Sequence, residues 1–258
     1  MSLFAAQNLA KSFGGVAAVH GVSLSVDAGE MVALIGPNGA GKSTCFAMLG
    51  GQIAPDRGDI RLADQPLSGS PLDFARAGVA RSFQIAKTFA SMSVRENVQT
   101  ALLAANRQIW RFWQAADTQA GADSDALLAR VGLAALAEQD AATLAYGDTK
   151  RLELAIALAG RPRVLLLDEP TAGMARPERR AAMQLIASLA ADGIAVLFTE
   201  HDMDAVFGFA SRILVMDRGR LVAEGTPAEI AANPVVQAVY LGTPDSSQQR
   251  PAGLSAGA

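Results

Sequence analysis

The 258-residue chain is poor in several residue types that would otherwise point to particular classes of protein. It has a single cysteine, Cys45, so no internal disulfide can form, and we expect this thiol to have a buried, apolar role in a reducing cytosol. Lysine occurs only four times and the formal net charge is −3. No basic stripe is present, which argues against general nucleic-acid binding.

The chain also lacks a long hydrophobic run, since no apolar stretch reaches membrane-spanning length without a charge. Residues 1–4 are not followed by a signal-peptide pattern. Half of the residues are nevertheless apolar, which suits a sizeable core. We therefore expect a globular protein of one large or two small domains that is soluble, or bound to a membrane through a partner.

The most informative segment follows the apolar run 31–35 and matches the G-x-x-x-x-G-K-S/T phosphate-binding loop, in the order strand, turn, helix. Its glycines let backbone N–H groups turn toward phosphate oxygens, and the helix that starts near Gly41 directs its positive dipole end at the same anion. Lys42 supplies a charge for the outer phosphates, and the Ser43 hydroxyl can ligate Mg²⁺. The residues assigned to nucleotide binding here are Gly36, Pro37, Asn38, Gly39, Ala40, Gly41, Lys42, Ser43 and Thr44.

Four further polar residues stand at or just after the ends of predicted strands. Asp168 and Glu169 follow four apolar residues, so we expect them at the C-terminal edge of the sheet, where α/β proteins bind ligands. Asp168 would hold Mg²⁺, and Glu169 would polarise the attacking water. His201 follows the strand predicted at 194–199 and can reach a γ-phosphate. Gln84, at the end of a short predicted strand, could contact both Mg²⁺ and the water.

Strands alternate with helices along most of the chain, which predicts an α/β sheet with helices on its faces. The middle, at about 85–160, carries helices without strands and is predicted to be a helical lobe. The segment from residue 243 onward is rich in Pro, Ser, Gln, Gly and Ala, and it is expected to be disordered. The expected strands are 3–9, 22–26, 31–35, 58–62, 80–84, 164–168, 194–199, 212–216 and 220–223, and the expected helices are 42–49, 93–105, 123–137, 148–159, 177–191 and 203–210.

The order of these motifs resembles that of the ATP-binding subunits of ABC transporters. The ordered motifs are the phosphate loop, Gln84, the segment Leu144-Ala145-Tyr146-Gly147-Asp148, the strand ending in Asp168 and Glu169, and His201. The likeness covers residues 1–242 as one ATP-binding domain. It implies a P-loop NTPase core of the RecA-like type with an antiparallel β subdomain and an inserted α-helical subdomain at about 85–160.

The resemblance also implies an ATPase that uses ATP and Mg²⁺ and dimerises head to tail. Each site would combine one protomer's phosphate loop with the segment 144–148 of the other, so Tyr146 and Gly147 would contact the partner's nucleotide. In this family Lys42, Glu169 and His201 correspond to catalytic residues. Phe13 stands where relatives place an aromatic that stacks on adenine; a core position beside the Gly-Gly turn is an equal alternative.

Several segments narrow the resemblance to the ATPases of branched-chain amino acid importers. The long linker at 106–122 narrows it further, to the larger of the two ATPases in those importers. These segments are 144–155, 169–174 and the C-terminal Glu224-Gly225-Thr226-Pro227, Asn233-Pro234 and Tyr240-Leu241-Gly242. The resemblance implies a paralogous ATPase in a heterodimer, or a second copy in a homodimer, together with two permeases and indirectly a periplasmic binding protein. It places the chain at the cytoplasmic face of the bacterial inner membrane, with residues 85–93 against a permease.

Two residues of this chain depart from the family's usual pattern, and two alternative functions are also considered. Ala145 stands where the family has a serine that donates to the partner's γ-phosphate, and Ala175 where an aspartate or asparagine is usual, so a weakened partner site and altered coupling are expected. The alternatives are an ATPase for lipopolysaccharide extraction and a non-transport ABC protein of translation or repair. Trp110 and Trp113 either pack against a permease or seal the helical lobe's own core.

Overall fold

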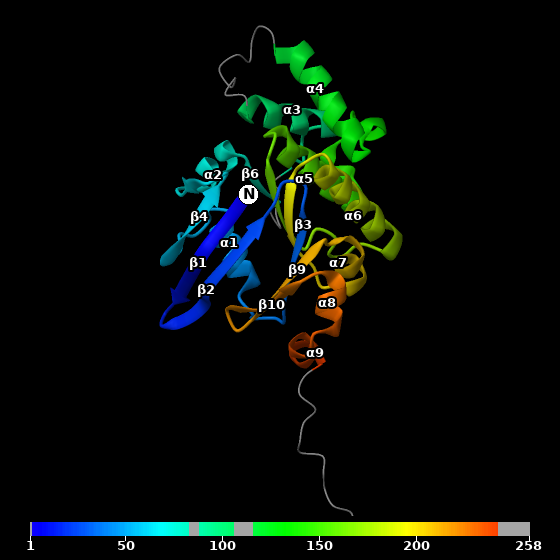
Figure 1. Cartoon of the computed structure of the whole chain (residues 1–258). Helices are drawn as coiled ribbons and strands as arrows, with labels where there is room; N and C mark the ends of the chain where they lie inside the picture. The colour runs from blue at the N-terminus through cyan, green and yellow to red at the C-terminus, as the bar shows by residue number, and fades with distance from the viewer. Residues whose placement is uncertain (1, 83–87, 106–115, 242–258) are drawn as a thin grey trace, which may run out of the picture.

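Strands that are apolar along their whole length build the centre of the protein, because such strands are buried on both faces of a parallel sheet. β3 (Met31–Ile35) and β8 (Ala195–Thr199) are buried at every residue, and β7 (Val164–Asp168) at all but the last. The computed structural model describes residues 2–82, 88–105 and 116–241. Figure 1 shows these strands at the middle of the molecule.

The central strands belong to a six-stranded sheet with the order β10-β9-β3-β8-β7-β6. β9 (Arg212–Asp217), β3, β8, β7 and β6 (Val79–Ser82) run parallel, and β10 (Arg220–Gly225) pairs antiparallel with β9. Parallel strands end at a common edge, so the residues that follow β3, β7 and β8 emerge side by side. The topology alone therefore gathers the predicted phosphate loop, Glu169 and His201 at one edge.

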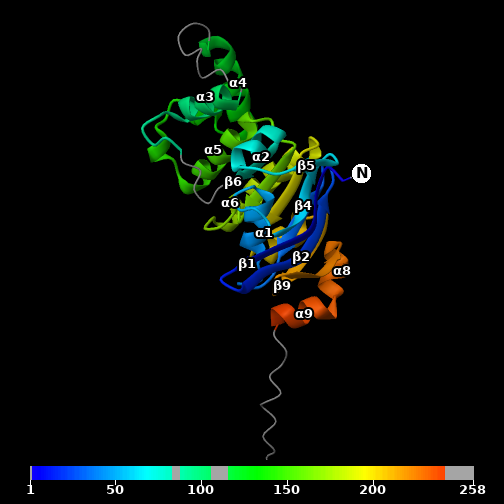
Figure 2. The same cartoon turned by 90° about the vertical axis from the view of Figure 1, so that its left-hand side faces the viewer.

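A second, antiparallel sheet has the order β2-β1-β4-β5. Its strands are β1 (Phe4–Phe13), β2 (Val16–Val26), β4 (Arg57–Leu62) and β5 (Gln65–Leu67). Helix α1 (Lys42–Leu49) lies between the two sheets (Figure 2) and buries Cys45 and Phe46 in the core that they share. Burial raises the pKa of the Cys45 thiol to about 12, which confirms the apolar role expected for this residue.

The helical lobe lies at one end of the molecule (Figure 1), where its Arg130 pairs with Asp192, shortly before the amino end of β8. It consists of α3 (Val94–Ala105), α4 (Ala116–Val131) and α5 (Tyr146–Ala159), with short 3-10 turns at Ala134–Leu136 and Ala141–Thr143. Val98, Leu128 and Leu152, one from each helix, are fully buried in its core. The remaining helices are α2 (Pro71–Ala77), α6 (Arg176–Ala191), α7 (Met203–Phe209), α8 (Pro227–Ala232) and α9 (Pro234–Leu241).

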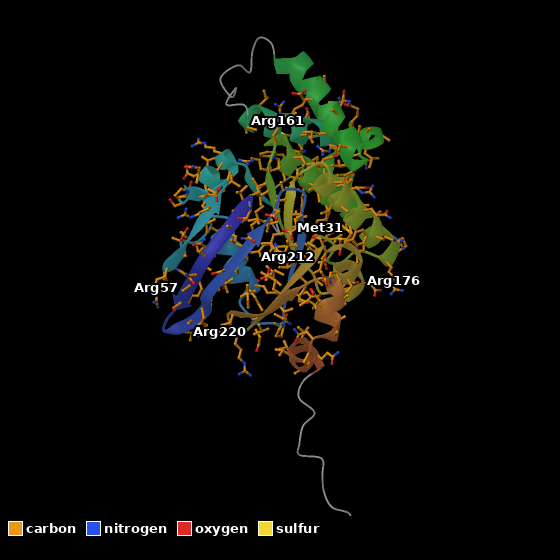
Figure 3. The ribbon with its side chains drawn as sticks, viewed as in Figure 1. Met31, Arg57, Arg161, Arg176, Arg212 and Arg220 are labelled. Carbon is orange, nitrogen blue, oxygen red and sulfur yellow. The ribbon has the colours of Figure 1, made fainter. Side chains whose placement is uncertain are left out.

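One arginine ties the two sheets together near the middle of the molecule (Figure 3). Arg212, at the start of β9, donates to both carboxylate oxygens of Glu30 at 2.7 and 2.8 Å and to the Ser25 carbonyl oxygen at 2.7 Å. A guanidinium that binds a carboxylate through two N–H groups is held in a fixed plane. The connection between β2 and β3 is thereby fixed just before the strand that leads into the phosphate loop.

The expected fold class is confirmed, and the limits of 31–35, 42–49 and 164–168 agree with the observed elements to the residue. The helix expected at 123–137 is wrong at both ends: α4 runs from 116 to 131. Gly132 follows it with φ 77°, a left-handed conformation that stops a helix. The helix expected to start at 148 begins two residues earlier, at Tyr146.

Other elements differ because short, locally weak segments are stabilised by their neighbours. The first two strands are longer than the predicted 3–9 and 22–26, since their pairing extends to the Gly-Gly turn. β5, α2, α8 and α9 were not predicted. Gln84, Trp110, Trp113 and the tail 243–258 lie outside the described residues. Among the helices of the described ranges, none is long and apolar enough to cross a membrane.

Candidate nucleotide site

Two glycines of the phosphate loop, Gly36 and Gly41, could not be replaced by another residue without a clash. Gly36 and Gly41 have φ of 155° and 100°. A Cβ at Gly36 would lie 2.2 Å from the Met216 carbonyl oxygen, and one at Gly41 would lie 2.4 Å from that of Ala18. The loop is thus wedged against β9 and the antiparallel sheet, and the requirement for glycine is steric as well as conformational.

Lys42 is folded back across this loop. Its ammonium donates to the carbonyl oxygens of Gly36 at 2.7 Å and Pro37 at 3.1 Å. Burial lowers the pKa of Lys42, and the nearby charges of Glu169 and Asp168 oppose that shift. The three predicted charged groups therefore share one electrostatic environment, although they come from positions more than 120 residues apart.

The amino end of α1 is open toward the loop. Its N-cap residue is Gly41, no side chain caps the helix, and its first turn holds no acidic residue. Ser43 and Thr44 lie in that first turn. An uncapped helix start of this kind presents N–H groups and the positive end of the dipole to an anion.

Asp168 is held by two hydrogen bonds at the end of β7. Its Oδ1 accepts from the Thr199 hydroxyl at 2.7 Å, and its Oδ2 accepts from the Arg81 guanidinium at 3.1 Å. Arg81 comes from the neighbouring strand β6 and also donates to Gln52. The carboxylate is therefore fixed in position at the edge of the sheet.

Glu169 and His201 meet at the same edge. The His201 Nε2 atom lies 2.9 Å from the Glu169 Oε1 atom, and the His201 and Glu169 side chains are 55% and 32% exposed. Glu169 has φ 48°, which is uncommon for a residue other than glycine. Its backbone N–H donates to the carbonyl oxygen and the hydroxyl of Thr199, at 3.1 and 3.0 Å. These bonds hold the acid and the imidazole together, accessible to solvent.

The oxygen atoms at this edge suit a magnesium ion. Mg²⁺ takes hard oxygen ligands and in nucleotide sites binds one or two carboxylates together with phosphate oxygens. Asp168 supplies a carboxylate at the end of β7, and Ser43 supplies a hydroxyl group in the first turn of α1. Gln84, the third predicted ligand, lies outside the described residues.

Phe13 ends β1 beside the turn at Gly14, and its side chain is half exposed, at 50%. The Lys11 ammonium lies 5.9 Å from the centre of its ring. The core alternative for Phe13 is therefore wrong, and the ring keeps a face available for stacking.

Tyr146 and Gly147 begin helix α5, whose N-cap residue is Ala145. Tyr146 is 53% exposed and lies against Gly173, where an added Cβ would be 3.4 Å from the tyrosine Cε1 atom. Ala175 is likewise the N-cap residue of α6. The two departures from the family pattern therefore occupy equivalent positions, and neither alanine has a side-chain oxygen with which to cap its helix.

Sequence reasoning missed Arg81, Thr199 and Glu200. The first two hold Asp168, and Glu200 is a carboxylate only 5% exposed next to His201. The one sequence signal for these residues was at Arg81, which is a charged residue inside a short predicted strand. Thr199 and Glu200 owe their partners to the pairing of β8 with β7, which no local pattern shows.

Comparison with known proteins agrees with this geometry. Residues 19–172 match the profile of the ABC transporter family, and residues 220–246 match that of the branched-chain amino acid ATP-binding cassette transporter. The high-affinity branched-chain amino acid transport ATP-binding protein LivG of Salmonella typhimurium is 42% identical over 252 residues, covering 93% of this chain and 98% of LivG. The lipopolysaccharide export system ATP-binding protein LptB of Acidithiobacillus ferridurans is 36% identical, covering 93% of this chain and 97% of LptB.

Solved structures show the same fold. The ADP conformation of MJ1267, an ATP-binding cassette of an ABC transporter, superimposes with a TM-score of 0.84 at 28% identity and covers 94% of this chain and 100% of its own. Both the sequence relatives and this structure span nearly the whole chain, including the helical lobe. The chain therefore belongs to the ABC transporter family, as one of its ATP-hydrolysing, ATP-binding subunits.

Proposed function

We propose that this protein is the motor subunit of an importer for branched-chain amino acids or related small organic solutes. The observation that carries the chemistry is the contact of Glu169 with His201 at 2.9 Å, at the sheet edge that holds Lys42. The match of residues 220–246 to the branched-chain amino acid cassette supports the cargo class. The domain proposed for this role covers 1–242, with the helical subdomain inserted at about 85–160.

The proposed hydrolysis uses groups with separate tasks. Lys42 and the N–H groups of residues 36–44 hold the ATP phosphates, and Phe13 stacks on the adenine. Ser43, Gln84 and Asp168 would hold Mg²⁺, which when bound neutralises charge on the phosphate oxygens.

At the reacting end, Glu169 orients water for in-line attack and accepts its proton, while His201 stabilises the γ-phosphate. The 2.9 Å contact between the two side chains supports this pairing of roles, since it would keep both groups beside the reacting atoms. Since catalysis of phosphoryl transfer is mostly positioning and charge stabilisation, this fixed geometry is the protein's main contribution.

Partners are proposed from surfaces that the fold leaves open. The start of α5, with Tyr146 half exposed, would complete the nucleotide site of a second ATPase, either a paralogue or another copy. Phe89 is 51% exposed, and its backbone is held by Asn97, which is 2% exposed. Asn97 thus fixes the backbone that carries the exposed Phe89 ring. Aromatic residues are enriched at protein interfaces, which supports a permease contact within 85–93.

The assembly implied by these contacts contains two permeases, with a periplasmic binding protein that delivers the solute. The chain would work at the cytoplasmic face of a bacterial inner membrane. Closure and reopening of the ATPase dimer would move the helical lobes and with them the permeases.

The test is the substitution Glu169→Gln, which keeps the size of the side chain and removes the base. We expect ATP binding to be retained and turnover to fall by about 10²-fold or more, because a general base contributes on the order of 10²–10⁴-fold. Glu138→Gln, at an exposed site of the helical lobe, is the matched control. Unchanged hydrolysis by Glu169→Gln would remove Glu169 from the reaction.

Lipopolysaccharide extraction is the second candidate, favoured by the 36% identity to LptB. Purification of the native complex separates the two functions. A second, shorter ATPase together with two permeases would support import, whereas a homodimer of this chain with exporter subunits would support extraction.

A further inference from the structure

Glu200 is a buried carboxylate to which the proposed hydrolysis assigns no task. It is 5% exposed, and its Oε1 atom accepts from the backbone N–H of Thr171 at 2.9 Å and from the Thr171 hydroxyl at 2.6 Å. Its Oε2 atom accepts from the backbone N–H of His201 at 3.3 Å. Burial of a charge is costly unless hydrogen bonds compensate for it, so these three donors account for its place.

The bonds of Glu200 are the middle part of a longer connection between two loops. On one side, Thr199 binds Asp168 and Glu169. On the other side, Arg179 donates to the Met174 carbonyl oxygen at 3.2 Å and forms an ion pair with Asp202. Each of the four residues from 199 to 202 thus contacts the segment from 168 to 179, as His201 does through Glu169.

This connection acts on a strained residue. Glu169 has φ 48°, and a non-glycine residue in this region is strained, so its surroundings must hold it there. The chain after Glu169 turns back on itself, since Ala172 N–H donates to the Glu169 carbonyl oxygen and Met174 N–H to that of Thr171, both at 3.1 Å. Thr171 is therefore the anchor of this turn, and Glu200 holds Thr171.

We infer that Glu200 is a positioning residue that keeps the Glu169 carboxylate and the His201 imidazole in contact. It binds the turn after Glu169 with one oxygen and the backbone of His201 with the other, so it sets the distance between the two loops. The inference rests on the proposed roles of Glu169 and His201, and it assigns Glu200 no contact with ATP.

The test is a kinetic double-mutant cycle on the full-length chain in its ATP-hydrolysing assembly. Glu200→Ala should lower kcat by about 10- to 100-fold and leave the KM for ATP unchanged, because a displacement of about 1 Å at a reacting group can cost 10²-fold. In a His201→Ala background the same substitution should cause little further loss, since residues that act through one another are not additive. A role in folding alone would give the full loss in both backgrounds.

Thr171 supplies a second, milder test in case Glu200→Ala does not fold. Thr171→Val removes the 2.6 Å hydroxyl bond and keeps the shape of the side chain, so kcat should fall, and Thr171→Ser should restore it. Wild-type kcat for both Glu200→Ala and Thr171→Val, or full additivity with His201→Ala, would overturn the inference. If His201→Ala and Glu169→Gln themselves leave hydrolysis intact, the proposed function fails instead.

Discussion

Two groups of helix starts in this protein differ in how their N–H groups are satisfied. Helices α7 and α8 are closed by their own side chains: Asp202 accepts from the Ala205 N–H at 3.0 Å, and Thr226 from the Glu229 N–H at 3.3 Å. Helix α1 begins instead at Gly41, with no side-chain cap and no acid in its first turn. A missing cap costs about 0.5–2 kcal/mol, so the open start of α1 lowers stability at the place where an anion is proposed to bind.

Helices α5 and α6 belong with α1 in this comparison, because their N-cap residues are Ala145 and Ala175 and neither alanine side chain caps its helix. The first turn of each contains an acid, Asp148 or Glu178, which the first turn of α1 lacks. Two of these three uncapped starts, those of α1 and α5, coincide with the segments proposed to face nucleotide or the partner ATPase. In this comparison, side-chain caps are absent at the starts of α1 and α5, which are proposed to face nucleotide, and present at α7 and α8, where they stabilise the helix starts.

The strongest way to break this comparison is to remove the charge beside the open start of α1. Lys42→Ala should abolish ATP hydrolysis, with a loss on the order of 10²–10³-fold or more, because one donor to a developing negative charge is worth that much. A phosphate-release assay measures the loss of hydrolysis, and calorimetry with Mg-ATP measures nucleotide binding by the same variant. Retained hydrolysis would show that the loop is not the phosphate site.

The next test closes the start of α1 sterically. Gly41→Ala would place a Cβ 2.4 Å from the Ala18 carbonyl oxygen at φ 100°, so nucleotide affinity should fall and unfolding should require less denaturant. Gly39→Ala is the matched control, since it has φ 80° with nothing within 4 Å and should cost only about 1–2 kcal/mol of backbone strain. Equal effects of the two changes would contradict the steric account.

A smaller effect is expected from adding the oxygen that α5 lacks. Ala145→Ser should stabilise the fold by about 0.5–2 kcal/mol as an N-cap. It should also raise turnover at the partner's site by about 10-fold, the value of one charged hydrogen bond. Ala175→Asn should give a similar gain in stability at α6. Steady-state ATPase assays and denaturant titrations measure both, and slower turnover in Ala145→Ser than in the parent would show that the alanine suits this subfamily.

The smallest effect on turnover should come from a helix start that serves only the fold. Thr226→Ala removes the side-chain cap of α8 and should lower the unfolding free energy by about 1 kcal/mol while ATP hydrolysis stays unchanged. Thr226→Ser keeps the hydroxyl and should retain the stability. A loss of hydrolysis in Thr226→Ala would end the distinction between the two groups of helix starts.

Sequence reasoning succeeded where structure is local and failed where partners are distant. The strand, loop and helix over 31–49 depend on neighbouring residues, and their limits were predicted to the residue. Arg81, Thr199 and Glu200 escaped because their partners lie 87, 31 and 29 residues away. The start of α5 was placed two residues late, since neither Ala145 nor Tyr146 is a residue that usually begins a helix.

By itself, the sequence determined where the phosphate loop is predicted, because the glycines, Lys42 and Ser43 lie within a few residues of one another. It also determined which carboxylates and which histidine follow apolar strands. Only the tertiary structure decided that Glu169 meets His201 and that buried Glu200 holds both loops. The physical reason is the placement of β8 beside β7, which joins two strand ends that the chain itself keeps about thirty residues apart.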